Sequence, residues 1–411
     1  MRQIYLNNAG SAFPLAPGVE EAVTACMRAP PLLSGRDVSG SADSLYRCRH
    51  SLAGLLAVSP EQVVLLPGAT HGLNVAILGL DLRKDDLVIT SVTEHNSVLR
   101  PLARLEDRLG IRIAYVPLAA DMKLDASIYD DLLKEKPRLV VLNHASNVTG
   151  RINPVGPWFK KAKSAGAVTL LDASQTVGRI PVHPHELQAD LTVFSGHKGL
   201  RGPLGTGGLH VAPSVSLAPV LVGGTGVKSD LRGHPDEMPL RLEAGTPNIP
   251  AFAGLDRAIR YIMKNVSDIT AAEAVMTQKL YRGLAEIEHV HIFDGDLSLQ
   301  SDAERQTAWD RATWNQTAWN RTAWNRAEAA PNETERLPTI SFQVMGMDTD
   351  QAGFALRESF GIHCRTGLHC APLIHTCLGS LPDGTLRFSP SFASPSEDID
   401  HAIDAVRRLA E

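Results

Sequence analysis

The sequence has few aromatic residues and few cysteines, and it contains no long apolar run. Aromatic residues fill only 5% of its 411 positions. The five cysteines are few for this length and odd in number, which argues against a disulfide framework and favours a reducing, cytoplasmic compartment. The first residues show no apolar signal-peptide core, and no run of about 18 apolar residues predicts a membrane span.

The sequence also has no excess of positive charge. Lys and Arg number 40 against 45 Asp and Glu, which gives a formal net charge of −5. This balance does not support a nucleic-acid-binding protein or a basic membrane-surface protein. Hydrophobic residues at 44% and charged residues at 21% are typical of a soluble globular protein. At about 150 residues per domain, the length predicts two to three domains.

Between residues 60 and 212, short apolar runs alternate with helical patterns such as Ser97–Leu109 and Val155–Ala165. The runs do not alternate strictly between apolar and polar residues, so we expect strands that are buried on both faces. This rhythm predicts an α/β fold with a mostly parallel seven-stranded sheet, and a ligand site beyond the carboxyl ends of its strands. The expected strands are Val63–Pro67, Leu87–Ser91, Ile111–Val116, Leu139–Asn143, Val168–Asp172, Leu191–Ser195 and Gly207–Val211.

After about residue 245 the pattern changes to two long helices and a second, smaller αβ unit. A capping box at Ser394–Glu397, with Pro395 at the first helical position, is expected to start a last helix that ends near Leu409. We therefore expect a large domain at 12–250 and a small domain that combines 1–11 with 251–411. The other expected elements are helices at Ala251–Asn265, Ala271–Ile287 and Thr349–Phe360, and strands at Thr339–Val344 and Leu386–Ser389.

Four of the five tryptophans recur every five residues within the segment 301–336. A period of five matches neither a helix face nor a strand face, and it is too short for a solenoid repeat. The segment therefore reads as a low-complexity surface insertion outside the main fold. A tryptophan platform that binds a partner is the alternative.

Several residues that can carry chemistry follow directly after predicted strands. A desolvated Lys198 would be a nucleophile able to form a Schiff base, although a lysine in an exposed loop is the alternative. Asp172 can pair with a protonated pyridine nitrogen or cap a helix. Gly68–Thr70 opens a helix, where backbone N–H groups can hold a phosphate, or forms a simple tight turn. His95 and Asn147 are expected to face the same crevice.

Taken in order, these residues resemble the class V aminotransferase family, and most closely its cysteine desulfurase branch and the SufS-like group. The resemblance covers nearly the whole chain except 301–336. It implies the pyridoxal 5′-phosphate (PLP) fold-type I architecture and a homodimer. The motifs that carry it are Gly68-Ala69-Thr70, Thr93-Glu94-His95, Asn147, Asp172-Ala173-Ser174-Gln175, Ser195-Gly196-His197-Lys198, Glu243-Ala244-Gly245-Thr246-Pro247-Asn248, Arg365-Thr366-Gly367-Leu368-His369-Cys370-Ala371-Pro372 and Gly384-Thr385-Leu386-Arg387-Phe388-Ser389.

The resemblance also implies a role for each residue. Lys198 would hold PLP as a Schiff base and move the substrate's Cα proton, and Asp172 would keep the pyridine nitrogen protonated. His95 would stack on the ring and assist proton transfer. Thr246 would reach the phosphate of the neighbouring subunit, and Arg387 would clamp the substrate carboxylate. The implied cofactor-binding residues are Ala69, Thr70, His95, Asn147, Asp172, Gln175, Ser195, His197, Lys198 and Thr246, and Asn147 and Arg387 bind the substrate.

Cys370 distinguishes between the reactions that this family performs. In a desulfurase its thiolate would attack the sulfur of L-cysteine, leaving L-alanine and a persulfide for an acceptor protein in sulfur metabolism, such as iron–sulfur cluster assembly. Arg365 and His369 would favour the thiolate. The alternatives are a selenocysteine lyase, another class V transaminase or lyase that does not use Cys370, and a non-catalytic scaffold. The spacing of Cys364, Cys370 and Cys377 does not match the paired ligands of zinc sites, so no metal is expected. The other four cysteines are expected to pack inside the protein.

Overall fold

The computed structural model describes residues 2–29, 43–293 and 336–411. Its centre is a seven-stranded sheet with the strand order β2-β8-β7-β6-β5-β3-β4. Only β8 runs antiparallel to its neighbours, so the expected mostly parallel sheet is confirmed. The strands are β2 (Val63–Leu66), β3 (Leu87–Ser91), β4 (Arg112–Val116), β5 (Leu139–Asn143), β6 (Val168–Asp172), β7 (Leu191–Ser195) and β8 (Gly207–Val211).

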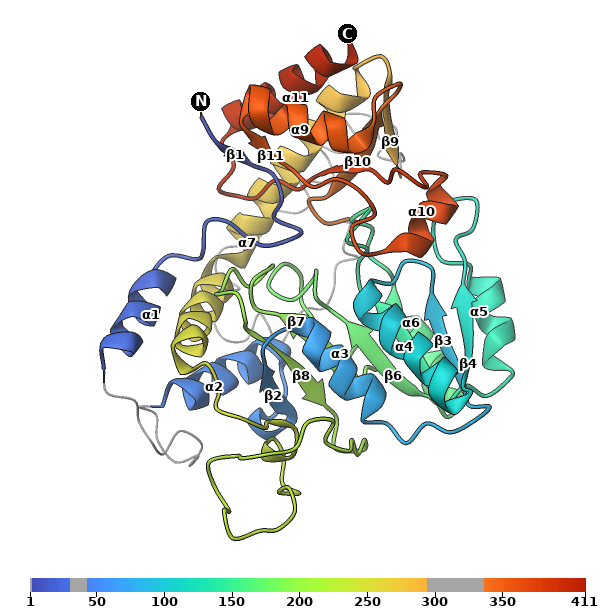
Figure 1. The fold of residues 1–411 in the computed structure, drawn as a ribbon, viewed down its shortest axis with the longest axis vertical. Coiled ribbons are helices and arrows are strands. Elements are labelled where there is room, and N and C mark those ends of the chain that lie inside the picture. Colours follow the sequence, from blue (N-terminus) through green and yellow to red (C-terminus); the bar gives the residue numbers. More distant parts are fainter. Residues whose placement is uncertain (1, 30–42, 294–335) are drawn as a thin grey trace.

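Apolar side chains of the central strands feed two separate hydrophobic cores. On β5, Val140 and Leu142 belong to one core, whereas Leu139 and Val141 belong to the other. Successive side chains of a strand point to opposite faces, so a strand covered on both sides needs an unbroken apolar run. Figure 1 shows α3 and α4 together on one face of the sheet. The helices of this region are α2 (Ser44–Leu56), α3 (Ala69–Leu78), α4 (Asn96–Leu109), α5 (Ala126–Leu133) and α6 (Val155–Ser164).

A single continuous helix, α7 (Ile249–Ala285), stands where two helices were expected. The expected break at 266–270 was wrong because Val266 and Ile269 are buried and continue the apolar face of the helix. No Gly or Pro interrupts this stretch. At about 1.5 Å per residue, α7 is roughly 55 Å long. Its first half packs in the core beside the large sheet and against α1 (Val19–Arg28), and its second half packs in a separate core.

That separate core lies in the C-terminal part of the chain and includes the first residues. A three-stranded antiparallel sheet has the order β12-β10-β9, and β1 (Ile4–Tyr5) pairs in parallel with β11 (Ile362–His363). Ile4 and Leu6 share one hydrophobic cluster with Leu356 and Phe388, and Figure 1 shows both termini at this end. The domain boundaries proposed from the sequence stay a prediction. The other elements are β9 (Val290–Phe293), β10 (Ile340–Val344), α9 (Thr349–Phe360), α10 (Pro372–Leu378), β12 (Leu386–Phe388) and α11 (Ser396–Ala410).

The capping box expected at the start of the last helix is not formed. Pro395 is the N-cap of α11, and no side chain caps this helix. The hydroxyl of Ser394 instead accepts a hydrogen bond from the backbone N–H of Ser391 at 3.0 Å. The turn that precedes the helix therefore uses the group that was expected to cap it.

The cysteines are less uniformly packed than expected. Cys48 is fully buried, and Cys364 packs against the core of the C-terminal part. Cys26 is half-buried and belongs to none of the hydrophobic clusters found among the described residues. Cys377 is exposed because the short helix α10 turns it towards solvent, so that expectation was wrong.

The tryptophan-rich segment lies outside the described residues, apart from its last residue. The guanidinium of Arg336 donates to the backbone carbonyls of Thr149 and Thr339. Arg336 therefore belongs to the fold rather than to the insertion. Within the described ranges, no helix has both the length and the apolar character needed to cross a membrane.

Candidate active site

A cavity of about 740 Å³ lies beyond the carboxyl ends of β5, β6 and β7. This is the edge of the sheet at which the strand pattern predicts a ligand site. Cys370 and Thr246 are not among the residues that line the cavity. The sequence-predicted residues that do line it are Ala69, Thr70, His95, Asn147, Asp172, Gln175, Ser195, His197, Lys198 and Arg387.

Lys198 lies on the loop directly after β7, is half-buried and lines the cavity. Burial lowers the pKa of its amine to about 8, and the positive charges of Arg387, Arg179 and Arg365 act in the same direction. The carboxylate of Asp172 opposes this shift. A substantial fraction of the amine is therefore neutral, and so nucleophilic, at slightly alkaline pH.

Asp172 is the last residue of β6 and is 6% exposed. Its Oδ1 accepts hydrogen bonds from both the backbone N–H and the hydroxyl of Ser174. These bonds fix the carboxylate in the cavity wall, and within the described residues no protein group donates a hydrogen bond to Oδ2. No α-helix begins at the turn that follows Asp172, so the carboxylate is not a helix cap.

His95 caps the N-terminus of α4 and faces the same cavity. Its Nδ1 accepts from the backbone N–H of Ser97 at 3.0 Å and lies 2.9 Å from the Ser97 hydroxyl. Burial lowers the pKa of His95 to about 4, and the nearby charge of Lys198 adds to the effect. The ring is therefore neutral at pH 7 with its proton on Nε2.

The start of α3 also lines the cavity. Gly68 is the N-cap of α3, and Ala69 and Thr70 open the helix. A Cβ at Gly207 on β8 would lie 2.7 Å from the Cα of Gly68, so this close approach requires a glycine. His197 lines the cavity as well; burial and Lys198 lower its pKa to about 4, and its Nδ1 is buried without a hydrogen-bond partner.

Arg387 comes from β12 and is 1% exposed. Its Nη1 donates to the backbone carbonyl of Asn147 at 2.9 Å, and its Nη2 donates to Oδ1 of Asn7 at 2.8 Å. Burial, together with the charge of Arg365, lowers the pKa of Arg387 to about 9. A guanidinium has five N–H donors, so the two protein contacts leave donors for an anionic ligand in the cavity.

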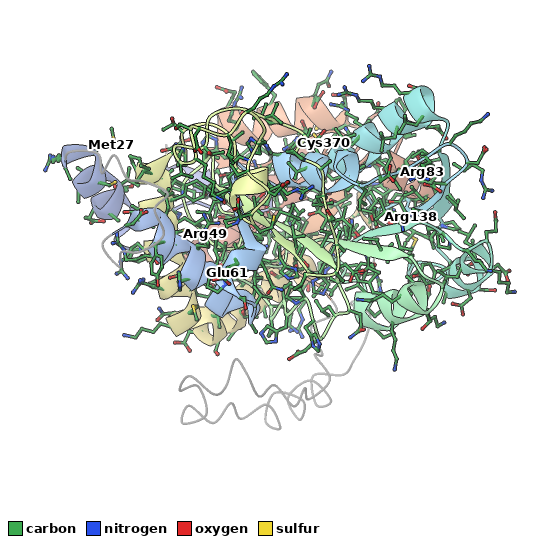
Figure 2. All side chains as sticks on the ribbon, turned by 90° about the horizontal axis from the view of Figure 1, so that it is seen from below. Met27, Arg49, Glu61, Arg83, Arg138 and Cys370 are labelled. Carbon is green, nitrogen blue, oxygen red and sulfur yellow. The ribbon has the colours of Figure 1, made fainter. Side chains whose placement is uncertain are left out.

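Cys370 lies on the loop between β11 (Ile362–His363) and α10 (Pro372–Leu378). Residues 369 and 370 both have positive φ angles, 49° and 58°, which is an unfavourable backbone for residues other than glycine. Three contacts hold them there. Asn147 Nδ2 donates to the His369 carbonyl at 2.8 Å, the Asn96 backbone N–H donates to the Cys370 carbonyl at 2.6 Å, and Arg365 donates to Cys370 Sγ at 3.4 Å. In Figure 2, Cys370 lies well inside the outline of the molecule, whereas Met27 is at its edge.

Arg365 is a basic residue in direct contact with Cys370, and the charge of Arg387 also interacts with this thiol. His369 was expected to contribute as well, but burial holds its pKa well below the usual value. The ring is therefore neutral at pH 7. Its Nε2 lies 2.8 Å from the hydroxyl of Thr385, and this contact fixes the orientation of the ring.

Thr246 is exposed and lies on the segment between the short 3₁₀ helix η2 (Leu240–Leu242) and α7. The base of this segment is tied down by Glu243, which pairs with Arg49 at 2.7 Å and accepts from the backbone N–H of Leu65. Figure 2 labels Arg49, which comes from α2. Thr246 is therefore exposed and does not line the cavity of its own chain.

Two residues of the site were missed from the sequence. Ser97 follows His95 by two positions, and this spacing at a helix start is a recognisable capping signal. Asn7 contacts Arg387, from which it is separated by 380 residues, so its part in the site carries no local signal. Within the described residues, no group of three or more His, Cys, Asp or Glu side chains is arranged to hold a metal ion.

Comparison with known proteins identifies the family. The profile of the family described as Aminotransferase class-V matches residues 5–307 and 322–402. The chain belongs to this family.

Two curated relatives carry the names of one particular enzyme. The chain is 28% identical over 374 residues to a probable cysteine desulfurase of Methanothermobacter thermautotrophicus, covering 89% of this chain and 84% of that protein. It is 29% identical over 374 residues to a cysteine desulfurase of Pectobacterium atrosepticum, covering 88% and 81%.

A solved structure gives the same result for the fold. The apo structure of a cysteine desulfurase from Thermococcus onnurineus NA1 superimposes with a TM-score of 0.81 at 28% identity. The match covers 99% of this chain and 94% of that one. The expectation of the PLP fold-type I architecture is confirmed.

Proposed function

We propose that this protein is a PLP-dependent cysteine desulfurase that converts L-cysteine to L-alanine and forms a persulfide on Cys370. One observation carries this proposal. The cavity brings the buried amine of Lys198 together with Asp172 and the carboxylate-binding Arg387, while Arg365 from the cavity wall contacts the Sγ of Cys370. A transaminase needs the first three groups, but it has no use for a cysteine held by an arginine in this way.

The cavity residues fit PLP. The buried Nδ1 of His197, which has no hydrogen-bond partner, lies beside the open backbone at the start of α3, where a phosphate group would be held together with Ala69, Thr70 and Ser195. Asp172 would hold the pyridine nitrogen, Gln175 the phenolic oxygen, and Lys198 the aldehyde carbon. When bound, the cofactor supplies an electron sink next to the substrate Cα. The side-chain amide of Gln175 is kept in place by its bond to the Ala9 carbonyl at 3.0 Å.

The chain's own residues perform the remaining steps. Arg387, with Asn147 beside it, orients the substrate carboxylate. The amine of Lys198 has a pKa of about 8, so its Nζ can accept the Cα proton and return a proton near neutral pH. The thiolate of Cys370 attacks the substrate sulfur, a sulfur–sulfur bond forms, and the sulfur–Cβ bond breaks. The electron pair of that bond stays with carbon, which takes up a proton to give alanine.

The proposal includes a homodimer and a protein acceptor. Val220 and Leu221 line the cavity, yet they are 44% and 55% exposed, and Thr246 is exposed and does not line its own cavity. Both observations support a second copy that covers the mouth and receives Thr246 at its phosphate. The half-buried Cys370 supports transfer of the persulfide to an acceptor that reaches the loop. All five cysteines are free thiols, which supports a cytoplasmic location.

The test is to incubate the PLP-loaded protein with L-cysteine and a reductant and to measure alanine and sulfide. We expect the wild type to release both in equal amounts. Cys370→Ala should bind PLP normally and lose at least about 100-fold in rate, because no other thiol reaches the substrate sulfur. The exposed Cys377→Ala is the matched control and should keep full activity.

Other outcomes identify the alternatives. Sulfide release that survives Cys370→Ala would reject the persulfide mechanism. Keto-acid formation with an amino acceptor, indifferent to Cys370, would indicate a transaminase. A parallel assay with L-selenocysteine separates the two lyase activities by their relative kcat/KM.

A further inference from the structure

We propose that Ser97 is a positioning residue that links the phosphate end of the cavity to the ring of His95. The inference rests on the proposed function, because it takes Thr70 as a phosphate ligand and His95 as the residue that stacks on the cofactor. Ser97 is the second residue of α4, is 8% exposed and lines the same cavity as both partners.

A continuous chain of hydrogen bonds connects the three side chains. Thr70 Oγ1 lies 2.7 Å from Ser97 Oγ, and Ser97 Oγ lies 2.9 Å from His95 Nδ1. Thr70 comes from the start of α3, and the other two residues come from the start of α4. The hydroxyl of Ser97 is therefore the shared contact between two helix ends that line one site.

The direction of these bonds follows from the protons available. The backbone N–H of Ser97 donates to His95 Nδ1, so Nδ1 is an acceptor and the ring proton lies on Nε2. The hydroxyl of Ser97 has one proton and two acceptors within reach, His95 Nδ1 and Thr70 Oγ1. Without an anion, the Thr70 hydroxyl donates to Ser97 Oγ and the Ser97 hydroxyl donates to His95 Nδ1. Each hydroxyl proton then has an acceptor.

A phosphate group changes this arrangement. Its oxygens accept, so the hydroxyl proton of Thr70 turns towards the phosphate, and Thr70 Oγ1 can then only accept from Ser97. The Ser97 proton is drawn to Thr70, and His95 Nδ1 keeps only the backbone N–H of Ser97. Ser97 therefore ties the occupancy of the phosphate site to the hydrogen bonding of the ring 2.9 Å away.

The first measurement uses inorganic phosphate and protein from which PLP has been removed. Calorimetry gives the phosphate affinity of the wild type, Ser97→Ala, Thr70→Ala and the double variant. We expect Ser97→Ala to weaken phosphate about 5-fold, the effect of one hydrogen bond. The double variant should bind phosphate no more weakly than Thr70→Ala does, because Ser97 acts on the phosphate through Thr70. Ser97→Thr keeps the hydroxyl and should restore binding, and Ser164→Ala on α6 is the control.

The second measurement follows the His95 ring by ¹³C NMR of labelled histidine, assigned with His95→Gln. Phosphate should shift the His95 signal in the wild type and shift it several-fold less in Ser97→Ala. Equal shifts in both proteins, or additive losses of affinity in the double variant, would overturn the inference. If Ser97→Ala has a clearly lower melting temperature than the wild type, the nearly isosteric Ser97→Cys is measured in its place.

The two proposals fail separately. A wild type that shows the phosphate effects but releases no alanine from L-cysteine retains the role of Ser97 and rejects the desulfurase. A wild type that releases alanine, with Ser97→Ala unchanged in phosphate affinity and in the His95 signal, retains the desulfurase and rejects this role.

Discussion

Glu94 is a buried carboxyl beside the site that the proposed mechanism does not use. Its Oε1 accepts from the hydroxyl of Ser91 at 2.7 Å and from the backbone N–H of Asn143 at 2.9 Å, and its Oε2 has no partner. Burial raises the pKa of Glu94 from 4.5 to about 8, against these hydrogen bonds and with the help of the nearby charge of Asp172. The residue is therefore mostly protonated at pH 7, which avoids a second negative charge close to Asp172.

This pKa predicts how stability depends on pH. Below pH 4.5 the carboxyl is protonated in both the folded and the unfolded chain. As the pH rises towards about 8, only the unfolded chain loses the proton. The unfolding free energy attributable to Glu94 therefore falls by about 1.4 kcal/mol per pH unit over this interval.

Glu94→Gln, which cannot ionise, should gain stability relative to the wild type between pH 5.5 and pH 8. Urea unfolding of both proteins at the two pH values measures the difference. Glu61→Gln, at an exposed site labelled in Figure 2, is the matched control. If the difference in unfolding free energy between Glu94→Gln and the wild type is the same at both pH values, the raised pKa of Glu94 is contradicted.

Helices and strands that depend on local sequence could be predicted, whereas contacts between residues far apart in the sequence could not. All seven strands of the main sheet were predicted to within one residue, because short buried runs are bounded by turn residues. Lys198 and Asp172 could be placed at one edge because parallel strands end together. Asn7 could not, because its contact with Arg387 spans 380 residues. The break expected in α7 fell on polar residues, of which Asp268 is exposed while Thr270 is half-buried and donates to the carbonyl of Arg179.

Helix packing gives a prediction at two glycines. Gly254 lies in α7, where a Cβ would come within 2.7 Å of Val23 Cγ2 and 2.8 Å of Pro203 Cγ. Gly54 lies in α2, where a Cβ would meet nothing within 4 Å. Gly254→Ala should therefore cost about 1–3 kcal/mol through overpacking, and Gly54→Ala should gain up to about 1 kcal/mol through helix propensity. Urea midpoints measure both, and shifts in the same direction would show that the packing of α7 against α1 is looser than described here.

At the scale of the whole molecule, the tryptophan-rich segment joins two strands that are already neighbours. Phe293 at the end of β9 pairs with Ser341 near the start of β10, in antiparallel register. The connection between them needs only a few residues to turn the chain. The long insertion is therefore not required for the two strands to meet.

Deleting residues 301–335 should leave PLP binding and the melting temperature unchanged. Deleting 301–336 removes Arg336 as well, and with it the contacts to the carbonyls of Thr149 and Thr339 beside Asn147. This second deletion should keep PLP but raise the KM for L-cysteine several-fold. The cofactor absorbance and the steady-state kinetics of the pair give the answer. Loss of PLP in the shorter deletion would mean that the tryptophans are structural.

The pairing of β1 with β11 also sets the order in which the site is completed during translation. Asn7 is made 380 residues before its partner Arg387. The backbone of Leu6 likewise forms its hydrogen bonds with His363 and Ser389 only after both of these residues have been made. The large sheet, whose strands all lie between residues 63 and 211, can form much earlier. A nascent chain therefore contains the residues proposed to bind the phosphate long before it contains Arg387, the residue proposed to bind the substrate carboxylate.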